Sequence, residues 1–470
     1  MDLGIDRQAL VPVVQQIVTA VAQWIRNNQV SPGTRLPSVR QLALDNLLSQ
    51  SNVIEAFERM VAQGVLAHRQ GAGFVVAQPP VTTECQWYEG AELTWGAFAD
   101  NPLGELKLGC GWLPDAWHES DDISYAIREV TRTDTAGLFN YSTPLGLPAL
   151  REQLLRRLTR IHIATRVDCI LTTAGASHAQ DLLIRVLLKA GDSVVVETPG
   201  YGNLYRQLAF HGVQLLEVPR TPGGPDIAAL EALLQHHRPK CLFVHSLYHN
   251  PTGSSLCRAV AERLLELARR ENFLIIEEDV FGDLQHPSCT RLAALPHEGR
   301  VIYVASFSKT LSSALRVGYL CASATLVTQL ASLKTLTGLG TSRFAEAVVG
   351  TLLANGTYRK WVQRLRKRLS MEMAATLQVL EDEEWEVFAV PAGGMFLWAR
   401  PGAADHSRLQ ACARRLGVLL SPGALFNPTG EYSEWLRINV AYAADQRALA
   451  LLRAMGPARS TSTVLKTTGL

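Results

Sequence analysis

The 470-residue sequence predicts an α/β protein in two parts, a small helical unit followed by a large unit built on a mostly parallel sheet. Residues 1–77 contain helix-period segments and end in a glycine-rich hairpin. Residues 78–103 have no clear periodicity and carry two prolines near their start, which is typical of a linker. Residues 104–455 alternate β-branched strands with helices, as in a sheet covered on both faces. Residues 456–470 are polar and are expected to form a disordered tail.

The composition is that of a compact protein with a large core, since 47% of residues are hydrophobic and 19% are charged. The net charge of +2 argues neither for nor against a polyanionic partner. The eight cysteines include no CxxC pair, a pattern that fits free thiols in a reducing cytosol. The first residues lack a basic head followed by an apolar stretch, and no apolar run reaches roughly 18 residues. We therefore expect a cytoplasmic protein with no membrane partner.

The N-terminal unit has the order of elements of a winged helix-turn-helix. Apolar residues at helix spacing predict a first helix over roughly residues 11–28. Ser38 is placed to cap a short second helix, and a third helix is expected to start near Ser49. Two β-prone runs within residues 65–76 flank a turn with two glycines, which predicts a hairpin suited to be a wing.

Three helices and a wing would place the start of the third helix in a major groove of double-stranded DNA. The predicted DNA contacts are Arg35, Arg40, Ser49, Gln50, Ser51, Asn52, Arg69 and Gly71. Against this stands the charge of residues 1–77, where six arginines, no lysine and five carboxylates leave a balance of only +1. Such a balance is a poor electrostatic footprint for a polyanion. A degenerate interaction module is therefore the alternative to a DNA reader.

The pentapeptide Leu36-Pro37-Ser38-Val39-Arg40 resembles the LPS-x-R hallmark of GntR-type winged helices. The resemblance covers nearly all of residues 10–77 and implies a DNA-binding unit. Members of that family often carry an arginine where this sequence has Gln50, which leaves open the loss of one phosphate or guanine contact.

The large unit carries a set of residues that suits pyridoxal 5′-phosphate (PLP), which needs a lysine, a carboxylate at its ring nitrogen, phosphate donors and an aromatic face. Lys309 follows an apolar strand directly and is the candidate for the imine. Arg316 is placed to clamp the phosphate in a bidentate manner. Ser306 and Ser308 add hydroxyl donors.

Three further candidates lie at the ends of other predicted strands. Asp279 ends the strand FLIIEED, where an acidic side chain at the carboxyl end of a strand points into the ligand crevice. Gly175, Ala176 and Ser177 open a helix, so their backbone N–H groups can cradle an anion. Tyr201 offers an aromatic face. No metal site is predicted.

Together these motifs resemble fold-type I aminotransferases across roughly residues 104–455. The resemblance implies a mostly parallel central sheet flanked by helices and a smaller C-terminal α+β subdomain. It favours Asp279 over Glu277 and Glu278 as the acid at the ring nitrogen, and it assigns stacking on the ring to Tyr201. It also assigns a hydrogen bond to the phenolic oxygen of the ring to Asn250 of the sequence His-Asn-Pro-Thr-Gly.

Two more roles follow from this resemblance alone. Arg437 matches the arginine that grips the α-carboxylate of an amino acid. Tyr141 matches the tyrosine that reaches the phosphate in the partner subunit, which implies a homodimer. Phe281 departs from the pattern because many relatives have a tyrosine there, and a phenyl ring cannot donate a hydrogen bond. Asn250 is then expected to be the main donor to the phenolic oxygen.

The fused order of winged helix, linker and aminotransferase-like unit resembles the MocR subfamily of GntR regulators across essentially the entire chain. It implies a transcriptional regulator that senses PLP or a small amino compound. The alternative is a working aminotransferase that acts on an amino acid and a 2-oxo acid, because Lys309, Asp279 and Arg437 are all present. A third hypothesis is a non-catalytic scaffold with a degenerate cofactor site.

Overall fold

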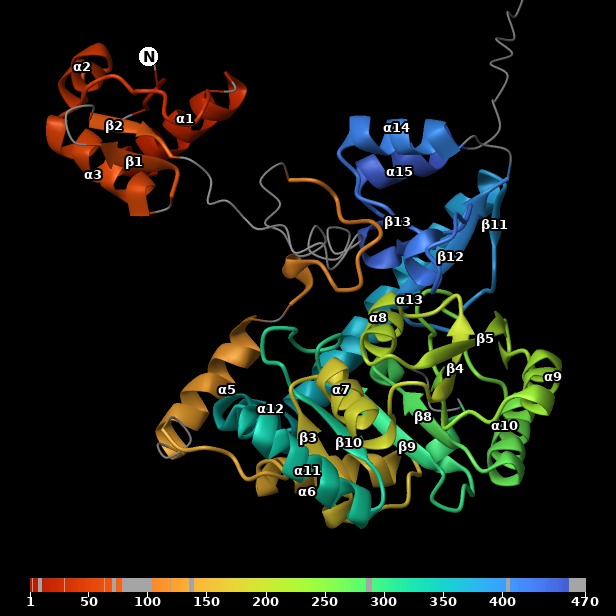
Figure 1. The fold of residues 1–470 in the computed structure, drawn as a ribbon. Coiled ribbons are helices and arrows are strands. Elements are labelled where there is room, and N and C mark those ends of the chain that lie inside the picture. The colour runs from red at the N-terminus through yellow and green to blue at the C-terminus, as the bar shows by residue number, and fades with distance from the viewer. Residues whose placement is uncertain are drawn as a thin grey trace, which may run out of the picture. The chain divides into compact units, whose positions relative to one another are not determined.

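In the computed structural model the chain divides into two compact units, Met1–Ala99 and Asp100–Leu470, which are shown in Figure 1 and are described separately. The described residues are 1, 3–6, 11–28, 30–62, 64–69, 73–77, 104–118, 120–134, 139–284, 290–402 and 406–455. The expected linker over 78–103 and tail over 456–470 lie outside them. Among the described helices, none is long and apolar enough to cross a membrane.

The N-terminal unit is a winged helix-turn-helix, as predicted. It consists of α1 (Val13–Asn27), α2 (Val39–Asp45), α3 (Gln50–Ala62) and a hairpin of β1 (Leu66–Arg69) and β2 (Gly73–Val76). The strands of the hairpin pair in antiparallel register from Leu66 opposite Val76 to Arg69 opposite Gly73.

The sequence signals at the starts of α2 and α3 act as helix caps. Ser38 Oγ accepts the backbone N–H of Gln41 (3.1 Å), and Ser49 Oγ accepts that of Asn52 (3.2 Å). These bonds satisfy N–H groups that a helix start leaves unpaired. One apolar face of each helix fills the core of the unit, with Ile17, Val21, Leu42, Val53, Phe57 and Met60 all buried.

The large unit is built on an eight-stranded sheet that is mostly parallel, as predicted. Its order is β3 (Ile170–Thr173), β10 (Gly318–Cys321), β9 (Val301–Ser306), β8 (Leu274–Glu278), β7 (Cys241–His245), β4 (Ser193–Thr198), β5 (Gln214–Thr221) and β6 (Gly224–Pro225). The strands β9, β8, β7, β4 and β5 pair in parallel. The strand β10, which was not predicted from sequence, is antiparallel to both of its neighbours.

Helices cover both faces of this sheet (Figure 1), because alternate residues of the buried strands face two different cores. One face packs against α7 (Ala176–Leu187), α8 (Gly202–Phe210) and α11 (Ala324–Gly338). The other packs against α5 (Ser120–Thr133), α6 (Pro148–Arg160), α9 (Ile227–His236), α10 (Arg258–Glu271) and α12 (Arg343–Ala354). The long helix α13 (Thr357–Asp382) contributes to both cores.

A smaller antiparallel sheet follows α13 and forms the expected C-terminal α+β part. Its order is β11 (Trp385–Val387), β12 (Phe396–Pro401), β14 (Leu436–Asn439) and β13 (Ser421–Pro422), accompanied by α14 (His406–Leu416) and α15 (Gln446–Ala454). Six short 3₁₀ helices complete the described elements: η1 (Asp115–Trp117), η3 (Val167–Cys169), η4 (Gly282–Leu284), η5 (Leu292–Ala294), η6 (Gly423–Phe426) and η7 (Val440–Tyr442).

The turn between α2 and α3 contains a residue whose backbone conformation favours glycine. Leu47 has φ of +55° and is 81% exposed. A left-handed conformation costs a residue with a side chain roughly 1–2 kcal/mol, and little burial would be lost with so exposed a leucine. We predict that Leu47→Gly raises the free energy of unfolding of the N-terminal unit by about 1 kcal/mol.

Hydrogen exchange of the α1–α3 amides in the full chain measures this change. Leu44→Gly is the matched control, because Leu44 is also exposed but lies within α2, where glycine costs about 1 kcal/mol. Equal destabilisation by both substitutions would contradict the prediction.

Candidate active site

The lysine predicted to bind the cofactor lies directly after β9 and is half-buried. Lys309 Nζ donates a hydrogen bond to the backbone carbonyl of Gly111 (2.9 Å). Burial, followed by the positive charge of Arg437, lowers the pKa of Lys309 to about 8. A substantial fraction of this amine is therefore neutral near physiological pH, which is the form that attacks a carbonyl group.

Arg437 comes from β14 of the C-terminal sheet and is buried beside the lysine. Its Nε and Nη2 both donate to the Gly109 carbonyl (3.1 and 2.8 Å), and its Nη1 donates to Asn250 Oδ1 (2.7 Å). The guanidinium lies 4.7 Å from the ring centres of Phe396 and Phe426. Burial lowers the pKa of Arg437 to about 10.

Gly111 lies next to both cations. A Cβ atom at this position would lie 3.6 Å from Lys309 Nζ and 3.6 Å from Arg437 Nη2. The structure thus brings together Lys309, Arg437 and Asn250, three residues that are 59 or more positions apart in the sequence.

The predicted anion cradle forms where β3 leads into α7. Gly175 precedes α7 with φ of +87°, and a Cβ there would collide with the guanidinium of Arg316. Arg316 Nη2 donates to the Ala174 carbonyl (2.9 Å) and Nη1 donates to Ser308 Oγ (3.0 Å). A glycine, a helix N-terminus and an arginine therefore converge, a combination that favours a phosphate group.

The remaining predicted cradle residues surround this point. The Ser306 hydroxyl donates to Ser308 Oγ (3.1 Å), and the Ser308 N–H donates to Ser306 Oγ (3.1 Å). Ala176 is the first residue of α7. Ser177 is linked by its side chain to Tyr201, whose pKa is raised by burial and then by the charge of Glu278.

The three acids at the end of β8 face opposite sides of the sheet. Glu277 accepts the backbone N–H groups of Leu292 and Ala293 (2.8 Å each), and Asp279 Oδ2 accepts from Arg291 Nε (2.6 Å) and from the Tyr303 hydroxyl (2.7 Å). Glu278 is turned toward α7.

Glu278 Oε2 accepts from Gln180 Nε2 (2.7 Å) and lies 3.2 Å from His245 Nε2. Its charge acts on both Lys309 and Tyr201, whose pKa values it raises. The predicted acid, Asp279, is instead occupied by Arg291 and Tyr303.

Tyr141 makes none of these contacts within the single chain, where it is 77% exposed. Arg316 is exposed as well. The role expected of Tyr141 requires a second subunit, and it stays a prediction. Phe281, by contrast, is buried and packs edge-on against Phe396 (5.2 Å between ring centres), so it is part of the core behind Arg437.

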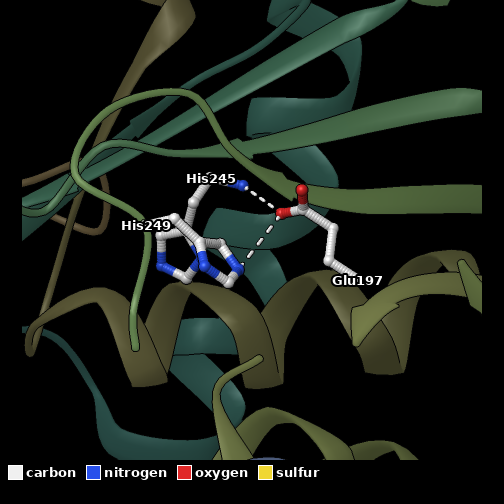
Figure 2. A group of neighbouring side chains, drawn as sticks. All are labelled: Glu197, His245 and His249. Atoms are coloured by element: carbon white, nitrogen blue, oxygen red, sulfur yellow. Dashed lines mark hydrogen bonds and ion pairs between the residues drawn. The ribbon is translucent and has the colours of Figure 1, made fainter. Parts of the chain in front are cut away.

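Behind these residues lies a buried polar group, Glu197, His245 and His249, whose ligand atoms are all within 4.8 Å of one another (Figure 2). The spacing would suit a metal ion, but the charge of Glu197 is already matched by Arg220, whose Nη1 donates to Glu197 Oε1 (2.5 Å). His245 Nε2 is engaged by Glu278. Burial and the charge of Arg220 lower the pKa of His249 well below its usual range. These contacts favour a structural role for Glu197, His245 and His249 over metal binding.

In the N-terminal unit, the predicted DNA contacts are mostly at the surface. Arg35, Arg40, Ser49, Gln50, Ser51 and Arg69 are exposed, and Asn52 is half-buried. Gly71 lies outside the described residues. Arg35 forms an isolated β-bridge with Val75 of β2, which attaches the segment before α2 to the wing. The Ser49 hydroxyl caps α3 and is hydrogen-bonded with the Ser51 hydroxyl (3.0 Å), whereas Gln50 is an exposed polar residue at the helix start.

The loop Gly109-Cys110-Gly111 was not predicted from sequence, although it supplies both carbonyl groups that hold the two cations. The Leu419 N–H donates to the Leu106 carbonyl (2.8 Å) and the Gly109 N–H donates to the Leu419 carbonyl (3.0 Å), so this segment pairs with the chain just before β13. A Cβ on Gly109 would collide with the backbone of Ser421. Two glycines flanking one residue were the available signal, but that pattern alone does not point to a lysine 198 positions away.

Two family models match the chain. The description "aminotransferase class I and II" covers residues 104–454, and "bacterial regulatory proteins, gntR family" covers residues 13–76. The first match spans most of the chain, so the chain belongs to the aminotransferase class I and II family. Its N-terminal unit is a GntR-type domain, and this fusion is the arrangement of the MocR subfamily.

The chain is similar to several named proteins. It is 26% identical to the uncharacterised HTH-type transcriptional regulator YisV of Bacillus subtilis strain 168, over 93% of this chain and 94% of that one. It is 31% identical to the 2-aminoadipate transaminase of Thermus thermophilus, over 61% of this chain and 74% of that one. The crystal structure of Pyrococcus horikoshii kynurenine aminotransferase with PMP superposes with a TM-score of 0.72, at 26% identity, over 81% of this chain and 96% of that one.

The lowered pKa of Lys309 predicts how attachment of PLP depends on pH. Covalent attachment needs the neutral amine, so its rate is expected to rise with pH and to level off above about 8, instead of rising on toward the ordinary lysine value of 10.5. Arg437→Met removes a positive charge that disfavours protonation of the Lys309 amine. We therefore expect the midpoint of the curve of attachment rate against pH to move to higher pH. Stopped-flow absorbance after mixing PLP with the cofactor-free protein measures both.

Arg400→Met is the control, since Arg400 lies on β12 and is paired with Glu386 (2.6 Å). The prediction is refuted if the attachment rate of the wild-type protein has its midpoint near pH 10.5. It is also refuted if Arg437→Met leaves the midpoint unchanged, because Arg437 would then not lower the pKa of Lys309.

Proposed function

We propose that this protein is a transcriptional regulator that binds PLP at Lys309 and double-stranded DNA through its N-terminal unit. The observation that carries the proposal is the convergence of Lys309, Arg437 and the cradle at Gly175 in a chain that begins with a winged helix-turn-helix. A relative that matches along nearly the whole chain is named an HTH-type transcriptional regulator.

The residues present fit PLP. Lys309 offers an amine of lowered pKa to the aldehyde, and Arg316 with the start of α7 offers a cationic cradle to the phosphate. Tyr201 forms a wall beside the cradle through its link to Ser177. Bound PLP supplies an electron sink for chemistry at an amine. The crystal structure of the similar kynurenine aminotransferase contains PMP, which supports the same cofactor class here.

Arg437 is the residue proposed to recognise the effector. Its guanidinium is held by Gly109 and Asn250 and is buried between two aromatic rings, so it is preorganised for a carboxylate. The neutral Lys309 amine lies beside it, on the other side of Gly111. A small compound with a carboxylate and an amino group could bind Arg437 through its carboxylate while its amino group lies near Lys309 and the cofactor.

A homodimer is part of the proposal. Arg316 and Tyr141 are exposed in the single chain, and a second copy would cover the phosphate end of the site. Effector binding would then change DNA affinity only if the two arrangements of the dimer bind the effector differently. Such a regulator acts where the chromosome is, which in bacteria is the cytoplasm.

A working aminotransferase is the second candidate, because Lys309 and Arg437 are both in place and because a similar protein is named 2-aminoadipate transaminase. Steady-state turnover with a panel of amino acids and 2-oxoglutarate decides between the two. Turnover typical of metabolic enzymes, without binding to the upstream region of its own gene, would establish the enzyme.

For the regulator, Arg40 gives the sharpest DNA-binding prediction. Its side chain is exposed at the second position of α2, and no carboxylate pairs with it among the described residues. We predict that Arg40→Ala weakens binding to DNA of any sequence, because one phosphate contact is lost. The slope of the logarithm of the binding constant against the logarithm of the salt concentration should then become less steep by about 1. A gel-shift series at several salt concentrations measures both quantities.

Arg59→Ala is the matched control, since it removes the same charge from the last turn of α3, where Arg59 is paired with Glu55 (2.7 Å). If Arg59→Ala changes the salt slope as much as Arg40→Ala does, the contact is not specific to the predicted surface. If the wild-type protein does not shift the DNA at all, the regulator proposal fails.

A further inference from the structure

We infer that Glu278, positioned by His245 and Gln180, is the carboxylate that faces the ring nitrogen of the cofactor, and that Asp279 is a structural acid. This inference rests on the proposed binding of PLP. It assigns the acid of the site to a residue that the sequence pattern had passed over.

The side chains at the end of β8 point in different directions. Successive residues of a strand point to opposite faces of the sheet. Glu277 and Asp279 both turn to the face where η5 and Arg291 lie. Glu278 turns to the other face, where it meets Gln180 of α7. The cradle at Gly175 opens the same helix, so Glu278 and the proposed phosphate site share one face.

Asp279 is already bound by other side chains of the chain. Its Oδ2 is bonded by Arg291 and Tyr303, both buried. Its Oδ1 has no hydrogen-bond partner among the described residues, but a Cβ on Gly282 would collide with it, so the backbone of Gly282 covers that oxygen. Although burial opposes it, the charge of Asp279 raises the pKa of Arg291, which shows a tightly coupled ion pair.

Glu278 is held through only one of its two carboxylate oxygens. Both of its bonds, from Gln180 and His245, are made to Oε2. A glutamate has one more rotatable bond than an aspartate and loses more side-chain entropy when it is fixed. The contacts of Gln180 and His245 with Oε2 fix the Glu278 side chain before the cofactor binds, and they leave Oε1 for a donor in the site. The charge of Glu278 already raises the pKa values of Tyr201 and Lys309 there.

The polar group of Figure 2 supports His245 from behind. The backbone N–H of His245 donates to Glu197 Oε2 (2.9 Å), and the other oxygen of Glu197 is paired with Arg220. Burial lowers the pKa of His245, but the charge of Glu278 outweighs burial and the net pKa is raised. The contact with Glu278 therefore favours the charged imidazole, and this cation holds Oε2 of Glu278 in place.

Titration of the cofactor-free protein with PLP, and with 1-deazapyridoxal 5′-phosphate, in which C–H replaces the ring nitrogen, tests the assignment. Loss of a hydrogen bond between charged groups predicts that Glu278→Gln weakens PLP binding by about 10- to 100-fold. The same substitution is expected to leave binding of the deaza analogue unchanged, and Glu278→Asp is expected to restore part of the loss. His245→Asn should weaken binding of PLP less, and again leave the analogue unaffected.

Asp279→Asn is the matched control. It is expected to lower the melting temperature, because the buried Arg291 loses its partner, while it keeps the ratio of the two affinities at the wild-type value. The inference is overturned if Asp279→Asn, and not Glu278→Gln, abolishes the preference for PLP over the analogue. It is overturned equally if Glu278→Gln weakens both ligands alike, which would mark a purely structural residue.

The outcome separates this inference from the proposed function. A wild-type protein that binds neither ligand refutes both. A wild-type protein that binds PLP covalently at Lys309, together with a Glu278→Gln variant that binds it equally well, refutes only the role of Glu278.

Discussion

The site of the large unit depends on two cations on either side of Gly111, the half-buried Lys309 and the buried Arg437. The positive charge of Arg437 lowers the pKa of Lys309, and the hydrogen bonds that hold the two side chains include none to a carboxylate. Backbone carbonyls of Gly109 and Gly111 and the amide oxygen of Asn250 stabilise them instead. Buried charges without a counter-ion are costly. A fold retains such an arrangement where an anionic ligand supplies the missing charge, and this is the physical reason for placing the effector site here.

The rest of the large unit brings these cations together. Lys309 comes from the end of β9 in the parallel sheet, whereas Arg437 comes from β14 in the antiparallel sheet. The segment before Gly111 pairs with the chain just before β13 of the second sheet, through an isolated bridge between Leu106 and Val418. The carbonyls of Gly109 and Gly111 thus bind the lysine that follows one sheet and the arginine of the other. The site is a product of this junction, so it forms only when both parts of the unit are folded.

Much of this could be predicted from sequence because it is local. Apolar runs marked the parallel strands, and a lysine, an arginine and a small-residue turn at strand ends marked the site. The acid was harder to assign, since three neighbouring carboxylates end β8 and the family pattern pointed to Asp279. Strand alternation places Glu278 on the opposite face to Asp279, but which face holds the site depends on where α7 packs. That contact, like the loop before Gly111, joins residues far apart in the chain.

The most direct test of the account is the covalent link between PLP and the amine of Lys309. Borohydride reduction of the protein incubated with PLP, followed by proteolysis and mass spectrometry, locates the attached group. We predict one labelled peptide, the one that contains Lys309, and no stable label in a Lys309→Ala variant that remains folded. A label at another lysine, or none in the wild-type protein, would contradict it.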